Sequence, residues 1–198
     1  MSSRQSSAGS RLGRRNDPER REKIIDACQK VIVESGVTGT SHRKVATQAG
    51  VPLGAMTYYF DGMQDLLHST FSRFATSISD DFERHMATAT DKESACERVF
   101  ERILQASSGD DDELILSHEL YTLATRDASF RSITTQWMQR SRVALELHFD
   151  PLTARLLDAM IEGLTIHRAL DSEAREPSEI KTAIARITKD SREGSLST

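Results

Sequence analysis

The 198-residue sequence contains only two cysteines, one tryptophan and four prolines, and it has no long apolar run. Cys28 and Cys96 fall on the apolar faces of different predicted helices, so we expect two reduced, packed thiols rather than a disulfide. No stretch approaches the roughly 20 apolar residues that a membrane-spanning helix needs. The first residues lack the apolar segment of a secretory signal peptide. These absences predict a cytoplasmic protein.

The sequence also lacks the motifs of common enzymes and metal sites. It has no phosphate-binding loop, no glycine fingerprint for dinucleotides and no nucleophile elbow. Ser117, His118 and Glu119 are residue types of a catalytic set, but consecutive residues of a helix point in different directions. The six histidines are scattered, with no Cys-x-x-Cys and no closely spaced pair. We therefore expect no enzyme activity, no cofactor and no metal.

What the sequence does contain is a helix-turn-helix pattern at residues 41–60, SHRKVATQAGVPLGAMTYYF. Ser41 is suited to cap a first helix over His42 to Ala49. Gly50 follows, where a left-handed backbone conformation costs least, and Pro52 suits the start of a second helix. Such a unit lays its second helix into the major groove of DNA. The apolar positions that we expect to share one core are Val45, Ala49, Val51, Met56 and Tyr59.

Short helical hairpins also occur in proteins that never bind DNA, and the distribution of charge argues against that alternative. Residues 1–60 carry 10 Lys and Arg against 5 Asp and Glu, whereas residues 61–198 carry 16 against 25. An acidic protein with one basic end fits DNA contact through that end, because neutralising phosphates supplies most non-specific affinity.

Helices are predicted on both sides of this motif. Asp17-Pro18-Glu19 is typical of a helix start, and apolar residues recur from Ile24 to Ile32 at helical spacing before Gly36 ends the helix. Asp61 is a candidate N-cap for a long helix from about Met63 to His85. The predicted buried positions are Ile24, Ala27, Cys28, Val31 and Ile32 in the first helix, and Leu66, Leu67, Thr70, Phe71, Phe74 and Ile78 in the long one.

With these segments in view, the chain resembles the TetR family of bacterial transcriptional regulators. The resemblance rests on NDPERREKIIDA, on SHRKVATQAGVPLGAMTYYFDGMQDLL, and more loosely on TQWMQRS and TARLLDAMIEGLTIH. These runs look like a branch that includes an enterobacterial regulator of biofilm and stress genes. Many family members have Tyr-Tyr-His-Phe where this chain has Thr57-Tyr58-Tyr59-Phe60, and Lys where it has Gln64. Contact with phosphate is still expected with these residues, but the operator sequence of the family does not carry over to this chain.

The remainder of the chain is predicted to be helical, and no strand pattern of length is present. Apolar residues recur at helical spacing over 91–106, 114–124 and 130–149, and Asp150-Pro151 and Pro177 are further helix starts. The predicted fold is all-α, with about nine helices. We expect a disordered basic arm at 1–16, a helix-turn-helix domain at 17–62, a regulatory and dimerisation domain at 63–190, and a disordered tail at 191–198. Arg11, Arg14 and Arg15 of the arm are either a contact along a DNA groove or part of a solvated tail.

The predicted DNA contacts divide into two groups. Those at the start of the first helix face phosphate or a base edge, with His42 either capping or contacting phosphate. Those of the second helix lie against the groove, where Thr57 is able to contact a thymine methyl and Tyr58 reaches phosphate. The complete set is Ser41, His42, Arg43, Lys44, Pro52, Leu53, Gly54, Ala55, Thr57 and Tyr58.

Two further surfaces are implied by the resemblance. The last two helices would pair with their copies in a four-helix bundle, and the alternative is that the same residues build the protomer core. A cavity lined by aromatic and polar side chains would bind a small molecule of unknown identity, and the alternative is again ordinary core. The dimerisation candidates are Leu156, Met160, Gly163, Leu164 and Ile184, and the ligand candidates are Phe100, His118, Tyr121, Trp137, Met138 and His167.

The sequence thus predicts a cytoplasmic, homodimeric transcription regulator, most simply a repressor, that binds a palindromic operator and responds to a small-molecule effector. The alternative is a helical protein-interaction or ligand-binding module without specific DNA binding, for which no salt-dependent DNA affinity is expected. Repression and activation differ in where the operator lies relative to a promoter, so the protein sequence does not distinguish between them.

Overall fold

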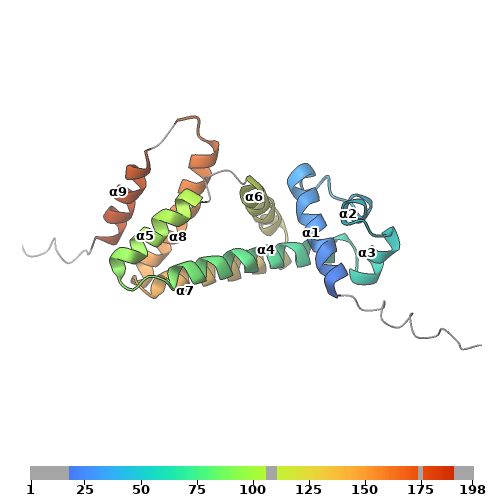
Figure 1. Ribbon diagram of the computed structural model, residues 1–198, viewed down its shortest axis with the longest axis horizontal. Helices are drawn as coiled ribbons and strands as arrows, with labels where there is room; N and C mark the ends of the chain where they lie inside the picture. Colours follow the sequence, from blue (N-terminus) through green and yellow to red (C-terminus); the bar gives the residue numbers. More distant parts are fainter. Residues whose placement is uncertain (1–17, 106–110, 174–175, 190–198) are drawn as a thin grey trace, which may run out of the picture. The chain divides into compact units, whose positions relative to one another are not determined.

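The computed structural model describes residues 18–105, 111–173 and 176–189, which form nine helices and no strand (Figure 1). This confirms the all-α prediction. The chain divides into two compact units, and the division falls between Thr70 and Phe71, eight residues later than the boundary expected from the sequence. The predicted arm at 1–16, Asp17 of the predicted helix start, and the tail at 191–198 lie outside the described residues.

The N-terminal unit is built on three helices and the start of a fourth. Helix α1 (Pro18–Ser35) packs on α2 (His42–Ala49), and α2 packs on α3 (Leu53–Tyr59). The side chain of Arg21 joins α1 to the segment after α3, because its Nη2 donates to Ser69 Oγ at 2.9 Å and its guanidinium lies 5.1 Å from the centre of the Phe60 ring. The core consists of Ile24, Ile25, Ala27, Cys28, Val31, Ile32, Val45, Ala46, Ala49, Met56, Phe60, Leu66 and Leu67.

The turn between α2 and α3 has the local chemistry that the sequence predicts. Ser41 has an extended backbone, and its hydroxyl accepts a hydrogen bond from the Lys44 amide at 3.3 Å. Gly50 adopts φ +63°, and the amide of Val51 donates to the Ala46 carbonyl at 3.0 Å. Pro52 caps α3, so this helix begins one residue later than its predicted start.

Helix α4 (Met63–Met86) crosses the boundary between the two units. Gly62, with φ +96°, precedes it directly, so the predicted N-cap Asp61 lies one residue too early. Instead, the carboxylate of Asp65 in the first turn accepts a hydrogen bond from the Asp61 amide at 2.9 Å. The predicted stripe of α4 is buried except for Ile78, which is half-buried.

The C-terminal unit contains the rest of α4 and five further helices. They are α5 (Lys92–Gln105), α6 (Asp111–Arg126), α7 (Ala128–Glu146), α8 (Pro151–Leu170) and α9 (Pro177–Thr188). Helix α7 packs between α6 and α8, and α5, α8 and α9 pack on one another. Asp127 and Asp150 cap α7 and α8 through hydrogen bonds from backbone amides in the first turns.

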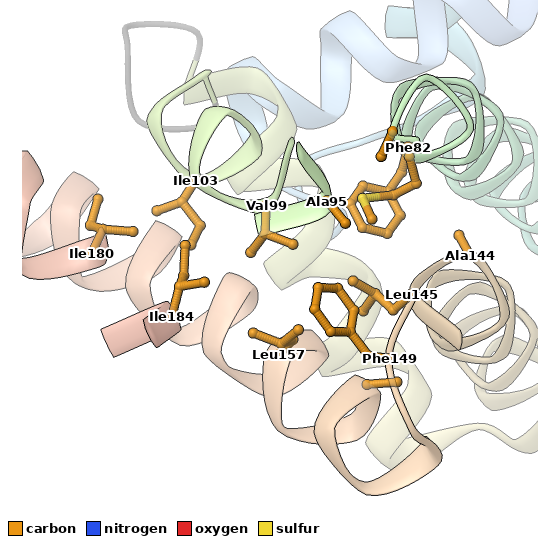
Figure 2. Packing of buried hydrophobic residues seen from close by; sticks show 13 residues of the cluster. Phe82, Ala95, Val99, Ile103, Ala144, Leu145, Phe149, Leu157, Ile180 and Ile184 are labelled. Atoms are coloured by element: carbon orange, nitrogen blue, oxygen red, sulfur yellow. The ribbon is translucent and has the colours of Figure 1, made fainter. Parts of the chain in front are cut away.

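One end of this unit is a continuous apolar core (Figure 2). Val99 and Ile103 of α5 point toward Leu157 of α8 and Ile184 of α9. Leu145 belongs to the same cluster, and it contributes from α7. The remaining members are Phe82, Met86, Ala89, Ala95, Ala144, Phe149, Ala154 and Ile180.

The two cysteines are free thiols, as predicted. Burial raises the pKa of the Cys28 thiol to about 11, although a hydrogen bond with Thr70 acts in the opposite direction. Cys96 is half-buried, with its Sγ 3.8 Å from the Thr188 hydroxyl. None of the described helices combines the length and apolarity required to cross a membrane.

Candidate nucleic-acid interface and cavity

The helix-turn-helix separates its buried residues cleanly from its exposed ones. Val45, Ala49 and Met56 are at most 2% exposed, and Val51 and Tyr59 are half-buried. Of the ten predicted DNA contacts, eight are exposed, while His42 and Ala55 are half-buried. The exposed set is Ser41, Arg43, Lys44, Pro52, Leu53, Gly54, Thr57 and Tyr58.

The exposed face of α3 is short of long polar side chains. Leu53 and Tyr58 are large and half or more exposed, at 50% and 56%. A Cβ added at Gly54 would meet nothing within 4 Å, so the backbone there is open to close approach. The Thr57 hydroxyl donates to the Gly54 carbonyl at 3.3 Å, which leaves its methyl group and an acceptor lone pair for an outside partner.

The start of α2 presents the cationic side chains. Lys44 Nζ lies 3.3 Å from Ser35 Oγ at the end of α1, and Arg43 is exposed beside it. His42 is half-buried, and its Nε2 is buried without a hydrogen-bond partner among the described residues. Burial of that nitrogen favours a packing role for His42 over contact with phosphate.

The C-terminal unit contains a cavity among α4, α5, α6, α7 and α8, with about 810 Å³ of empty space when its open mouth is included. Ile78 and Phe82 of α4 and Ile161 of α8 supply apolar wall. The wall also contains Ser79, Arg102, Glu113, Leu114, Ser117, His118, Tyr121, Trp137, Met138, Ser141, Asp158, Glu162, Thr165 and Ile166.

Aromatic rings form one part of this wall. The rings of Tyr121 and Trp137 are parallel, with an interplanar angle of 1° and centroids 5.9 Å apart. Phe74 meets Trp137 edge-on at 5.8 Å and holds the indole in place from outside the cavity. His118 Nδ1 lies 2.7 Å from the Leu114 carbonyl, so in the neutral ring Nδ1 carries the proton and Nε2 is an acceptor.

Charged side chains form another part of the wall. Arg102 makes an ion pair with Glu113. Asp158 accepts a hydrogen bond from Ser141 Oγ at 2.6 Å and lies 3.7 Å from Arg142 Nη1. Burial raises the pKa of the Asp158 carboxyl, against the hydrogen bond from Ser141 and the charge of Arg142. The cavity therefore contains an ionisable group whose charged form is destabilised by its surroundings.

The cavity gathers four of the six predicted ligand residues, namely His118, Tyr121, Trp137 and Met138. Phe100 lies elsewhere, against the apolar core and 4.4 Å below Lys181 Nζ. His167 borders a separate hollow between α8 and α9. Sequence reasoning missed Asp158 and Glu162, which lie one turn apart on α8 and both line the cavity.

The predicted dimerisation residues separate into two groups. Leu156 is 48% exposed, and a Cβ added at Gly163 would meet nothing within 4 Å. Met160 and Leu164 pack partly against the apolar core, and Ile184 is 3% exposed inside it. Ile184 thus belongs to the protomer core, which is the alternative that the sequence left open for it.

The fold and these two sites define a protein with a helix-turn-helix DNA-binding unit and a separate helical unit that contains a cavity. Two sequence profiles match the chain. The one described as "Bacterial regulatory proteins, tetR family" matches residues 24–70, and the one described as "Tetracyclin repressor-like, C-terminal domain" matches residues 87–190. The chain belongs to the TetR family of transcriptional regulators.

Individual relatives agree with this assignment. The putative transcriptional regulator SCO7518 from Streptomyces coelicolor A3(2) is 48% identical, with a TM-score of 0.82 over 87% of this chain and 100% of that one. The multidrug binding protein EbrR complexed with imidazole is 28% identical, with a TM-score of 0.74 over 94% and 98% of the chains, and EbrR is also known with ethidium, proflavin and malachite green. The transcriptional regulator PksA of Bacillus subtilis strain 168 is 26% identical over 84% of this chain and 86% of its own length. The protein is a DNA-binding transcriptional regulator.

Proposed function

We propose that this regulator is a cytoplasmic homodimeric repressor that binds an inverted-repeat operator through α2 and α3 and is controlled by a small molecule in the cavity. The observation that carries the DNA-binding part is the exposed face of α3 above a fully buried Met56. The named relatives are regulators, and this supports a binding function without catalysis. The kinship with an enterobacterial regulator of biofilm and stress genes stays a prediction.

Contact with DNA would divide between the two helices. Arg43 and Lys44 carry the charge that meets phosphate, and Tyr58 adds a hydroxyl donor. Leu53 and Thr57 present apolar groups that fit the C5-methyl of thymine in the major groove. Loss of a phosphate contact would weaken binding to all sequences alike, whereas a change at Thr57 would alter which sequence is preferred.

The dimer is supported by geometry and by exposed apolar residues. Helix-turn-helix proteins bind two half-sites about one DNA turn apart, which needs a two-fold pair. On α8, Leu152 and Leu156 are 61% and 48% exposed, and the open side of Gly163 permits close helix approach. We therefore centre the proposed interface on Leu152, Leu156 and Gly163, with Met160 and Leu164 at its edge.

Control by a small molecule is supported by the cavity and by EbrR, whose structures contain several small organic compounds. Helix α4 contributes to the cavity wall and also reaches the N-terminal unit, since it runs from Met63 to Met86. A ligand changes DNA affinity only if it binds one arrangement of the protein more tightly than the other.

The test is selection of bound sequences from a genomic DNA pool by the purified protein at fixed, near-physiological salt. We expect an enriched inverted repeat, and its position among promoters separates repression from activation. Arg43→Ala should lower affinity for all enriched sequences by about tenfold, and Thr57→Ala should change the consensus. Arg84→Ala is the matched control, because Arg84 is exposed on α4 and pairs only with Asp81 beside it among the described residues.

A folded dimer that enriches no sequence, with or without added small molecules, would contradict the proposal. It would favour the alternative function, a helical interaction module. A second diagnostic is the salt dependence of DNA affinity, which is steep for a reader of phosphate and absent for such a module.

A further inference from the structure

The cavity wall has more negative than positive charge. Glu113, Asp158 and Glu162 line it, and Arg102 is the one guanidinium among the described wall residues. Arg102 is already paired with Glu113, so this cation and this anion balance each other. The charge that remains on the wall comes from Asp158 and Glu162.

These two acids differ in how far the protein neutralises them. Asp158 accepts a hydrogen bond from the Ser141 hydroxyl, and its carboxylate lies 3.7 Å from the guanidinium of Arg142. Glu162 lies near the Tyr121 hydroxyl, which is neutral, and it contributes, after burial, to the raised pKa of that hydroxyl. Among the described residues, no cation lies within ion-pair distance of Glu162.

The two carboxylates also repel each other. Asp158 and Glu162 are four residues apart on α8, where side chains are neighbours and like charges destabilise the helix. Burial raises the pKa of Asp158, and the charge of Glu162 raises it further. A positive charge placed between them would relieve this repulsion, whereas an anion would add to it.

The aromatic wall stands beside these acids. Tyr121 links the two features, because its ring is parallel to that of Trp137 while its hydroxyl interacts with Glu162 in the same cavity wall. The faces of tyrosine and tryptophan rings attract cations, most strongly where water is excluded. A flat ring carrying positive charge would thus gain from the aromatic faces and from Glu162 at the same time.

We propose that the cavity binds an aromatic organic cation, with Glu162 as its counter-charge and Trp137 and Tyr121 as its stacking wall. Asp158 contributes further negative charge from the neighbouring turn. This inference rests on the proposed control by a small molecule and names the class to which the ligand belongs. It disfavours carboxylates and phosphates as ligands, since the guanidinium in the cavity wall is already paired with Glu113.

The position of the one tryptophan in the chain provides a direct readout. Trp137 lies in the wall, so its fluorescence reports on occupancy without a label, and calorimetric titration gives an independent affinity. The probes are N-methylquinolinium, neutral quinoline at a pH where it is unprotonated, and naphthalene-2-carboxylate. They share a two-ring size and differ in charge.

We expect N-methylquinolinium to bind about tenfold more tightly than quinoline, and naphthalene-2-carboxylate to bind most weakly. Glu162→Gln keeps the size and polarity of the side chain and removes the charge, so it should lower the affinity for the cation about tenfold and leave the affinity for quinoline unchanged. Glu97→Gln is the control, because Glu97 lies outside the cavity wall and pairs with Lys181 on the surface. If Glu162→Gln fails to fold by circular dichroism, Asp158→Asn takes its place, with a smaller loss of cation affinity expected.

Equal affinities for the three probes, preference for the carboxylate, or a cation affinity insensitive to both substitutions would overturn the inference. These titrations need no DNA, so they are separate from the test of the proposed function. Cation binding that leaves operator affinity unchanged would confirm the ligand class and refute ligand control. If quinoline released the operator as readily as the cation does, ligand control would be confirmed and the cationic ligand class would be refuted.

Discussion

The two units of the molecule place their functional side chains in opposite ways. In the N-terminal unit, the apolar residues of α1 to α3 fill the interior, and the candidate DNA contacts are turned outward. In the C-terminal unit, four of the six candidate ligand contacts face inward on long helices around a cavity. An outward site needs a complete core beneath it, whereas an inward site requires that the core be left incomplete.

The two units also differ in how many polar side chains they keep away from solvent. Thr70 is the one fully buried polar residue described in the N-terminal unit, and its hydroxyl is satisfied by the Leu66 carbonyl at 2.7 Å. The C-terminal unit retains Asp158, Glu162 and an Arg102–Glu113 pair around its cavity. We expect stability to dominate the response of the first unit to substitution, and ligand affinity to dominate the response of the second.

The largest effect is expected for Met56→Ala. Met56 is 0% exposed on the buried face of α3, and removing a buried side chain of this size costs about 2–4 kcal/mol. The N-terminal unit should lose cooperative unfolding and operator binding, while Trp137 fluorescence still responds to the cation. Calorimetry and fluorescence titration measure the two outcomes separately.

The control for Met56→Ala is Thr57→Ala, one residue away and exposed. It should change DNA specificity with little effect on the unfolding temperature. Loss of cation binding in Met56→Ala would contradict the separation of the two units, because it would mean that the cavity depends on the core of the N-terminal unit.

The contrast between the units also explains what the sequence could predict. The helix-turn-helix depends on local chemistry, since Ser41, Gly50 and the spacing of Val45, Ala49 and Met56 each act within a few residues. These signals are visible in one sequence, and the structure has the same cap, the same left-handed glycine and the same buried positions.

The cavity depends on which faces of five helices meet, and no local signal carries that information. Phe100 and His167 have the residue types of a ligand site, but the register of α5 and α8 places them away from it. Asp158 and Glu162 were overlooked because an acid in a helix usually faces solvent. The same limit applies to Ile184, whose apolar character suits a dimer interface and a protomer core equally well.

An intermediate effect is expected for Gly50→Ala, the residue that ends α2. A Cβ there would meet nothing within 4 Å, but φ is +63°, so the destabilisation arises from backbone strain alone and is about 1 kcal/mol. Gly54→Ala is the matched comparison, because Gly54 is helical, has equal space and does not have a positive φ. It should stabilise α3 by up to about 1 kcal/mol.

DNA affinity should separate this pair further. Gly54→Ala adds a methyl group on the face proposed to meet the groove, so it should weaken operator binding despite the gain in stability. Gly50→Ala should weaken binding only as far as it unfolds the unit. If Gly54→Ala binds the operator as tightly as the parent protein, then the α3 backbone does not approach the DNA at this position.

The smallest effect on stability is expected for Asp158→Asn in the cavity. Unlike Met56→Ala and Gly50→Ala, this substitution should stabilise the protein. Because burial raises the pKa of Asp158 in the folded protein, ionisation makes the native state less stable as the pH rises through that raised value. Asparagine keeps an acceptor for Ser141 and carries no charge, so the variant should be more stable than the parent near neutral pH, by less than about 1 kcal/mol. The difference should vanish at acidic pH, where Asp158 is protonated in both the folded and the unfolded chain.

Asp150→Asn provides the comparison, because hydrogen bonds from Thr153 and from the amides at the start of α8 lower the pKa of the Asp150 carboxyl. Its ionised form stabilises the fold above the unfolded-state pKa, and that contribution disappears as the pH falls through the lowered value. Asp150→Asn should therefore be less stable than the parent protein at neutral pH, with the gap closing in acid. Urea unfolding of both variants at neutral and acidic pH measures the two opposite trends. If Asp158→Asn proved less stable than the parent at neutral pH, attraction to Arg142 would outweigh burial, and the cavity would retain this acid for stability as well as for its ligand.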